Sequence, residues 1–257
     1  MICKLVPIGL ALGLPLVPAA VPAAVPADRA GLAWGACPGG GGPDGMECAK
    51  LAVPQDWSKP RGRKVTLMLG RLRADGPRPA EGSVLVDYGG PGAPGIALMR
   101  DRRMPPGSQP FARLRHRMHI VTWDPRGYGG LSSPNLDLTC VRNAPGGGAP
   151  DLPRTPAAFT RLAALNRANI DACRARDPEL FDQMDGAANA RDMEAIRPAL
   201  GEPRVNLYMG SYGSVYGQTY ARPYPGRIRT MVIDGGADHG DAFVRTQVAV
   251  ARDNAAA

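Results

Sequence analysis

The sequence predicts an α/β fold built on a mostly parallel sheet. Short apolar segments with β character recur along the chain, helical patterns separate the later ones, and the later strands run into glycine-rich turns. Parallel sheets carry their working loops at the carboxyl ends of the strands, so these turns are expected to meet at one edge. At 257 residues the chain is long enough for one such domain with a substantial core.

The first 27 residues read as a secretory signal peptide that is not part of this domain. Lys4 precedes an apolar segment from Leu5 to Val17, and residues 25–27 (VPA) offer a small-x-small cleavage site. The prolines and the short apolar span argue against a membrane anchor. We therefore expect a secreted, extracellular protein whose domain occupies residues 28–257, with no stable membrane anchor.

Export determines how the cysteines are interpreted. Without the leader four remain, namely Cys37, Cys48, Cys140 and Cys173. In an oxidising compartment an even set is typical of disulfides, and four cysteines allow three connectivities. Of these we favour the local pairs, Cys37 with Cys48 and Cys140 with Cys173. A metal site is the alternative, but no two of the cysteines have C-x-x-C spacing and the chain has only three histidines.

The net charge of +8 does not by itself indicate a nucleic-acid partner. Arginines are scattered along the chain and only 5% of the residues are aromatic. A nucleic-acid surface typically combines a basic stripe with interleaved aromatic side chains. The composition therefore favours a solvated, arginine-rich surface and no nucleic-acid partner.

The first part of the domain predicts an antiparallel hairpin followed by two buried strands. Residues 49–53 and 64–72 form the hairpin, and Trp57 in the turn between them can cover the core. Residues 83–88 are a continuous apolar run, which is typical of a strand buried on both faces of a parallel sheet. Residues 119–123 (HIVTW) predict the next strand.

Helices and strands alternate in the rest of the chain. The apolar residues recur at helical spacing in some segments and form short β-rich runs in others. The expected helices cover residues 156–176, 187–200 and 212–220, and the expected strands cover residues 205–208 and 230–234.

Residues 205–217, VNLYMGSYGSVYG, carry the strongest chemical signal. A strand, a tight turn around Ser211 and a helix are the sequence form of a nucleophile elbow. In an elbow the serine hydroxyl projects from the sheet, and the next backbone N–H, here that of Tyr212, faces a developing oxyanion. Gly213 supplies the small residue after the serine, whereas Met209 occupies a position that is usually small. A glycine-rich turn without chemistry is the alternative.

Two further loops are expected beside the elbow. The loop at residues 88–92 can present the N–H of Gly90, which with that of Tyr212 forms a two-donor oxyanion hole. A plain glycine-proline turn is the alternative for this loop. The loop that begins at Asp124 favours a structural role, in which Asp124 or Arg126 braces the elbow through hydrogen bonds.

Four ordered motifs together resemble one family. They are WSKPRGRKVTL (57–67), YGGPGAPG (88–95), WDPRGYGGLSSP (123–134) and VNLYMGSYGSVYG (205–217). Their order resembles the secreted tripeptidyl aminopeptidase and prolyl aminopeptidase-like branch of the α/β-hydrolase family. The resemblance runs from about Trp34 to Asp241 and covers the N-terminal half of that family's chains.

The resemblance implies an α/β-hydrolase fold with an N-terminal antiparallel hairpin, truncated before the last strands. It implies that Ser211 is the nucleophile and that Gly90 and Tyr212 give the oxyanion donors. The family releases short peptides or single residues from the free N-termini of peptide substrates through an acyl-enzyme, and no cofactor is implied. Met209 and one extra residue in the loop 129–132 depart from the family pattern.

The triad acid and histidine follow the serine in this fold, and in the family they belong to a segment with no counterpart before Ala257. Among the three histidines, His116 and His119 precede a strand at the edge opposite the elbow. His239 follows the last expected strand and is the one candidate base, with a surface-loop histidine as the alternative. Three functions stay open: an aminopeptidase represented by its N-terminal half, a non-catalytic remnant, and a small esterase that uses His239.

Overall fold

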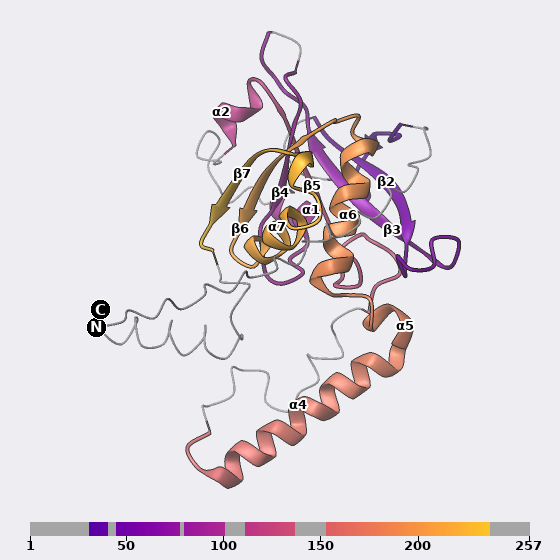
Figure 1. The fold of residues 1–257 in the computed structure, drawn as a ribbon, viewed down its shortest axis with the longest axis vertical. Helices are drawn as coiled ribbons and strands as arrows, with labels where there is room; N and C mark the ends of the chain where they lie inside the picture. Colours follow the sequence, from indigo (N-terminus) through magenta and orange to yellow (C-terminus); the bar gives the residue numbers. More distant parts are fainter. Residues whose placement is uncertain (1–30, 41–44, 78–79, 101–110, 137–152, 237–257) are drawn as a thin grey trace, which may run out of the picture.

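A computed structural model describes residues 31–40, 45–77, 80–100, 111–136 and 153–236 (Figure 1). They form a seven-stranded sheet in the order β1-β2-β3-β5-β4-β6-β7. The strands are β1 (Gly35–Ala36), β2 (Met46–Pro54), β3 (Lys64–Leu72), β4 (Ser83–Asp87), β5 (His119–Trp123), β6 (Val205–Gly210) and β7 (Ile228–Asp234). The helices are α1 (Gly95–Arg100), α2 (Ala112–Arg115), α4 (Pro156–Arg176), α5 (Pro178–Phe181), α6 (Gly186–Ala199) and α7 (Gly213–Ala221), with a 3-10 turn at Pro225–Arg227.

The strand directions confirm the predicted fold class. The hairpin β2–β3 is antiparallel and β3 pairs antiparallel with β5, whereas β4 lies between β5 and β6 and is parallel to both. The next pair, β6–β7, is also parallel. Most of the strands, β2 and β4 to β7, therefore run in one direction, so β4 to β7 end at a common edge.

The largest hydrophobic core is shared by the sheet, α6 and α7. All five residues of β4 are buried, as its continuous apolar pattern predicts. Helix α6 contributes Met193 and Ile196, which are both 0% exposed, and α7 contributes Tyr216 and Tyr220. These contacts fix the position of α7, the helix that follows the elbow, against the sheet.

Three short helices, α1, α2 and α5, are absent from the sequence-based prediction. Helix α1 starts at Gly95, where a Cβ atom would lie 2.2 Å from Thr122 Oγ1 and 2.5 Å from the carbonyl oxygen of Trp123. The helix therefore begins directly against β5, and only glycine allows that approach. Because the helix is six residues long, its sequence shows too few turns for a clear helical period.

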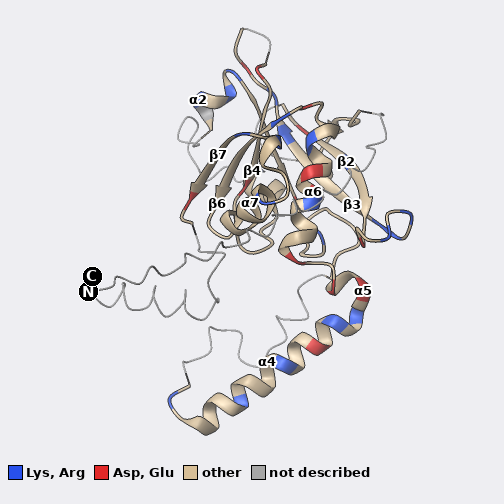
Figure 2. Ribbon diagram, viewed as in Figure 1, with Lys and Arg blue, Asp and Glu red and all other residues tan. Residues whose placement is uncertain are grey.

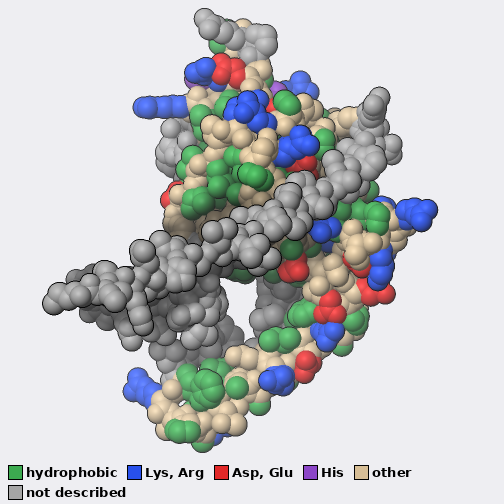
Figure 3. Space-filling model, viewed as in Figure 1, with side chains coloured by type: hydrophobic (Ala, Val, Ile, Leu, Met, Phe, Trp, Pro, Cys, Tyr) green, Lys and Arg blue, Asp and Glu red, His purple; other side chains and the backbone are tan. Residues whose placement is uncertain are grey.

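Helix α4 has the predicted bounds but projects away from the sheet (Figure 1). Phe159 is 63% exposed and Ile170 54% exposed, and Cys173 is its only fully buried residue among those described. Figure 3 shows apolar side chains at the surface of this arm. The helix predicted from apolar residues at helical spacing is thus present, although the rest of the described chain leaves Phe159 and Ile170 exposed.

The described sheet ends at β7, which is an apolar edge strand. Val232 is 53% exposed and Ile233 39% exposed. Such an edge presents unpaired backbone groups beside apolar side chains, a combination that favours pairing with a further strand.

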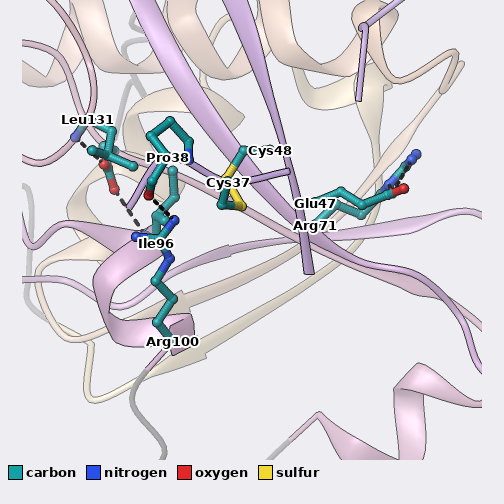
Figure 4. Close-up of a disulfide and its surroundings, with 9 residues drawn as sticks. Cys37, Pro38, Glu47, Cys48, Arg71, Ile96, Arg100 and Leu131 are labelled. Carbon is teal, nitrogen blue, oxygen red and sulfur yellow. Dashed lines mark hydrogen bonds and ion pairs between the residues drawn. A yellow bond between two sulfur atoms is a disulfide. The ribbon is translucent and has the colours of Figure 1, made fainter. Parts of the chain in front are cut away.

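The cysteine between β1 and β2 pairs as predicted. Cys37 and Cys48 form a disulfide where β1 pairs with β2 (Figure 4). The Arg100 side chain from α1 donates a hydrogen bond to the nearby Pro38 carbonyl. Cys173 is buried and disulfide-bonded, whereas Cys140, its predicted partner, lies outside the described residues.

Lysine and arginine are spread over the described elements and are not collected on one face (Figure 2). They lie in the β2–β3 turn, in α2 and along α4, where Asp171 is the single acidic residue.

None of the described helices combines the length and the hydropathy needed to cross a membrane.

Arg126 and Asp192 form a fully buried ion pair, with both side chains 0% exposed. The guanidinium binds both carboxylate oxygens, at 2.7 and 2.6 Å, and donates to the carbonyl oxygens of Pro54 and Gln55. Trp57 donates its indole N–H to the same carboxylate. The expected brace from Arg126 to the elbow is therefore wrong: Arg126 ties α6 and the Gln183 carbonyl before it to the end of β2.

Breaking this pair is expected to destabilise the protein strongly. Asp192→Asn leaves the Arg126 charge buried without a counter-charge, and the free energy of unfolding should fall by about 3–5 kcal/mol. Glu81→Gln, which removes the exposed ion pair with Arg117, is the matched control and should cost less than about 1 kcal/mol. Urea unfolding followed by tryptophan fluorescence measures both, and equal losses would contradict the structural role of the buried pair.

Candidate active site

Ser211 occupies the turn between β6 and α7 in a left-handed backbone conformation. Its φ is +50°, and it is the single non-glycine residue with positive φ in the described part of the chain. Its N–H donates to the carbonyl oxygen of Asp234 at 2.7 Å, and its own carbonyl accepts from Ser214 N–H at 3.0 Å. The side chain is exposed. The turn therefore lifts the hydroxyl out of the sheet at the end of β6, which is the geometry of a nucleophile elbow.

Met209, the departure from the small-x-Ser-x-Gly pattern, is accommodated by a glycine one turn into α7. A Cβ atom on Gly217 would lie 2.8 Å from Met209 Cγ, so the missing side chain makes room for the methionine. Met209 is 0% exposed. The larger residue thus fills the space between strand and helix and leaves the turn intact.

The glycine loop after β4 packs directly on the elbow. A Cβ atom on Gly89 would lie 2.7 Å from the carbonyl oxygen of Gly210, 2.8 Å from Ser211 Cβ and 3.0 Å from Tyr212 N. Gly89 has φ +96°, which also favours glycine. The loop and the elbow are therefore in van der Waals contact through backbone atoms.

Two backbone N–H groups next to this contact have no acceptor within the described residues. The N–H of Gly89 donates to Asp87 Oδ1 at 2.7 Å, whereas within the described residues neither Gly90 nor Tyr212 donates a backbone hydrogen bond. Buried or crowded backbone N–H groups normally find an acceptor. N–H groups without an acceptor, on two turns that meet at a serine, can donate hydrogen bonds to an anionic oxygen that forms there.

The loop after β5 supports the glycine loop. The Asp124 carboxylate accepts the N–H of Ile96 at 3.0 Å and that of Leu131 at 2.6 Å, so it joins the start of α1 to its own loop. Tyr128 from this loop lies over Gly92, where a Cβ atom would come within 2.2 Å of the tyrosine ring. The three loops meet at one edge. Asp124 braces its own loop against the start of α1, and no hydrogen bond joins it to the elbow within the described residues.

Burial raises the pKa of two carboxyl groups at this edge. Asp87 is 4% exposed, and burial raises its pKa to about 7 despite the opposing hydrogen bond from Gly89. Burial also raises the pKa of Asp124, against two backbone hydrogen bonds that lower it. Asp87 escaped the sequence analysis, although an acidic residue at the end of an apolar strand was a visible signal for it.

The described histidines lie away from the serine. His119 begins β5 and accepts the N–H of Ala74 through Nδ1, and Nδ1 of His116 lies 3.0 Å from a carboxylate oxygen of Asp75. Both lie at the amino end of β5, whereas Ser211 follows the carboxyl end of the parallel β6. His239 lies outside the described residues, so its distance from Ser211 stays untested.

The strand order, with an elbow at the end of β6 and a glycine loop packed on it, defines an α/β-hydrolase fold. Sequence relatives confirm the resemblance to the tripeptidyl aminopeptidase branch. The chain is 32% identical over 213 residues to a tripeptidyl aminopeptidase of Streptomyces coelicolor, a match that covers 81% of this chain and 38% of that protein. It is 31% identical over 202 residues to a serine protease of Mycobacterium tuberculosis, covering 76% of this chain and 37% of the relative.

The chain thus spans well under half the length of these curated relatives. Among solved structures it is similar to an acetyl xylan esterase of Thermoanaerobacterium, with 14% identity, a TM-score of 0.41 and coverage of 78% and 50%. A proline iminopeptidase-related protein of Thermus thermophilus gives 19% identity, a TM-score of 0.35 and coverage of 72% and 43%. No protein-family model matches the sequence.

The contact between the glycine loop and the elbow predicts a difference between two glycines of similar backbone. Gly89→Ala introduces a Cβ atom within 2.7 Å of Gly210 O, whereas Gly129→Ala meets nothing within 4 Å, although φ is +96° and +107° respectively. Both variants share the conformational strain, so we expect Gly89→Ala to cost about 1–3 kcal/mol more in unfolding free energy. Chemical denaturation of both variants measures this difference, and equal stabilities would mean that the loop does not pack on the elbow.

Proposed function

We propose that this chain carries the nucleophile and the oxyanion hole of a serine peptidase. In the proposed reaction Ser211 Oγ attacks the scissile carbonyl carbon and passes its proton to a general base. The base returns that proton to the leaving amine, and an acyl-enzyme remains. Water then attacks the ester carbonyl and releases the acyl group, which restores the hydroxyl.

The left-handed turn of Ser211 against the Gly89 loop is the observation that supports this proposal. The turn exposes the Ser211 hydroxyl, and Gly89 packs on it, which supports a site where the hydroxyl faces the N–H groups of Gly90 and Tyr212. Two such donors stabilise the tetrahedral intermediate, each typically by about 3 kcal/mol. The relatives named as a peptidase and a protease share this region of the chain.

The finer assignment is a secreted aminopeptidase that takes peptides with a free N-terminus. The name of the Streptomyces relative, tripeptidyl aminopeptidase, supports this substrate class. The Cys37–Cys48 disulfide fits an oxidising compartment, in line with a signal peptide over residues 1–27. Because the matched region is 38% of that relative, substrate preference rests on the relative and not on a described pocket.

The general base is proposed to lie after β7. His239 is the one histidine of this chain that follows the elbow in sequence. In the small-esterase alternative it would take the proton from Ser211 directly. In the aminopeptidase the acid and the histidine come from the part of the family's length that this chain does not match.

A fluorophosphonate probe tests the nucleophile. The protein should form a covalent adduct at Ser211, identified by peptide mass spectrometry, and Ser211→Ala should abolish it because no other hydroxyl at this edge lies on a strained turn. Ser58→Ala, which removes an exposed serine in the β2–β3 turn, is the matched control and should leave labelling unchanged. Labelling that survives Ser211→Ala would contradict the proposal.

The same assay separates the functions for this chain. Loss of labelling in His239→Ala supports the small esterase, whereas labelling that persists in His239→Ala excludes His239 as the base. A well-folded chain without any adduct favours the non-catalytic remnant.

A further inference from the structure

A buried carboxyl group lies beneath the two turns that form the proposed oxyanion hole. Asp87 is the last residue of β4 and stands opposite Met209 of β6, two residues before Ser211. It is 4% exposed, and the proposed reaction gives it no role. Buried carboxyl groups are costly, so a side chain of this kind at a reactive edge calls for a physical reason.

The Asp87 carboxyl contacts both turns. Its Oδ1 accepts the N–H of Gly89 at 2.7 Å, and the Gly89 backbone in turn packs on Ser211 and Tyr212. A Cβ atom on Gly213, the first residue of α7, would lie 2.6 Å from the same Oδ1. One carboxyl oxygen therefore lies between the glycine loop and the first turn of the helix that follows the nucleophile.

Among the described residues, the groups that interact with Asp87 provide no cation. The titratable side chain that interacts with it from α7 is Tyr216, whose buried hydroxyl also interacts with the backbone of Gly92. Tyr128 and Tyr212 interact with Tyr216 in turn. On the β6 side Asp87 stands opposite Met209, which cannot titrate.

Two further described acids lie at this edge, and both have other partners. Asp234, which ends β7, accepts a hydrogen bond from the Tyr208 hydroxyl. Asp124, which follows β5, accepts the N–H of Ile96 with one carboxyl oxygen and that of Leu131 with the other. A negative charge on Asp87 would have no cation partner among the described residues, and with 4% exposure the side chain is largely shielded from water.

We propose that Asp87 is a positioning residue whose neutral form holds the glycine loop in the geometry that accepts an oxyanion, and whose ionisation switches this hole off. The inference rests on the proposed function of Ser211. In its neutral form the carboxyl oxygen still accepts the Gly89 N–H and places no charge under the hole. In its ionised form it puts a like charge close to the oxygen that becomes negative in the transition state.

The sign of the pH dependence follows from the burial of Asp87. Burial raises the pKa of this carboxyl to about 7, so the neutral form predominates below neutrality and the ionised form above it. Activity that depends on the neutral form is retained at low pH and lost as the pH rises through 7. This fall is separate from the rise that any general base produces when it loses its proton.

The first test follows the structure and needs no activity. Backbone amide NMR signals of Gly89, Gly90 and Tyr212 should titrate together in the full chain with a midpoint near 7, and Asp87→Asn should remove this titration. Tyr216→Phe is the matched control, because it removes the facing hydroxyl and keeps the carboxyl; the titration should persist. Amides of Gly90 and Tyr212 that do not move with pH would overturn the proposal, whatever the serine does.

The second test follows the chemistry through the rate of fluorophosphonate labelling at Ser211. We compare the labelling rate of Asp87→Asn with that of the wild type as a ratio. Both proteins have the same general base, so the effect of its titration on the rate is the same in both and drops out of the ratio. This ratio should be near one at about pH 5.5 and rise to about tenfold at about pH 8.5, because the amide cannot ionise.

Asp87→Ala removes the acceptor of the Gly89 N–H and should label slowly at every pH. A flat ratio, or one that falls below one at high pH, overturns the inference while Ser211 labelling stands. Absence of labelling in the wild type instead counts against the proposed function, and the NMR titration still decides the role of Asp87.

Discussion

The left-handed backbone of Ser211 is the constraint on which the rest of this edge depends. A residue with a Cβ atom at positive φ costs about 1–2 kcal/mol, so its surroundings must hold it there. The hydrogen bond from Ser211 N–H to Asp234 ties the turn to β7. Gly89 and Gly213 supply the space that a Cβ atom would fill on either side. The glycines at this edge therefore allow the close packing that holds Ser211 in its strained backbone conformation.

The same packing explains how much of the site the sequence could predict. A strand buried on both faces reads as a continuous apolar run, which is why residues 83–88 and 119–123 were recognised as strands, and Ser211 followed from the strand-to-helix pattern. Met209 departs from the motif when its position is considered alone. The structure relates Met209 to Gly217, and the pair conserves the total volume between strand and helix.

Features that depend on distant partners escaped the sequence analysis. The acceptors of Arg126 lie 57 to 72 residues away, on α6, at Gln183 before it and at the end of β2, so its sequence neighbours give no indication of them. The burial of Asp87 depends on Gly213, a residue of another element. The apolar stripe of α4 shows the converse limit: a helical period predicts a face but not whether anything covers it.

The direction of the strands also restricts where a base for Ser211 can come from. His119 stands at the first residue of β5, and the five residues of that strand span about 16 Å along the direction shared with β6. A hydrogen bond to the serine hydroxyl needs about 3 Å. His116 precedes the same strand and is farther from its carboxyl end. A histidine that serves as the base for Ser211 therefore belongs to a segment outside the described residues. A segment that follows β7 starts from the correct edge, because the carbonyl of Asp234 at the end of β7 accepts the Ser211 N–H.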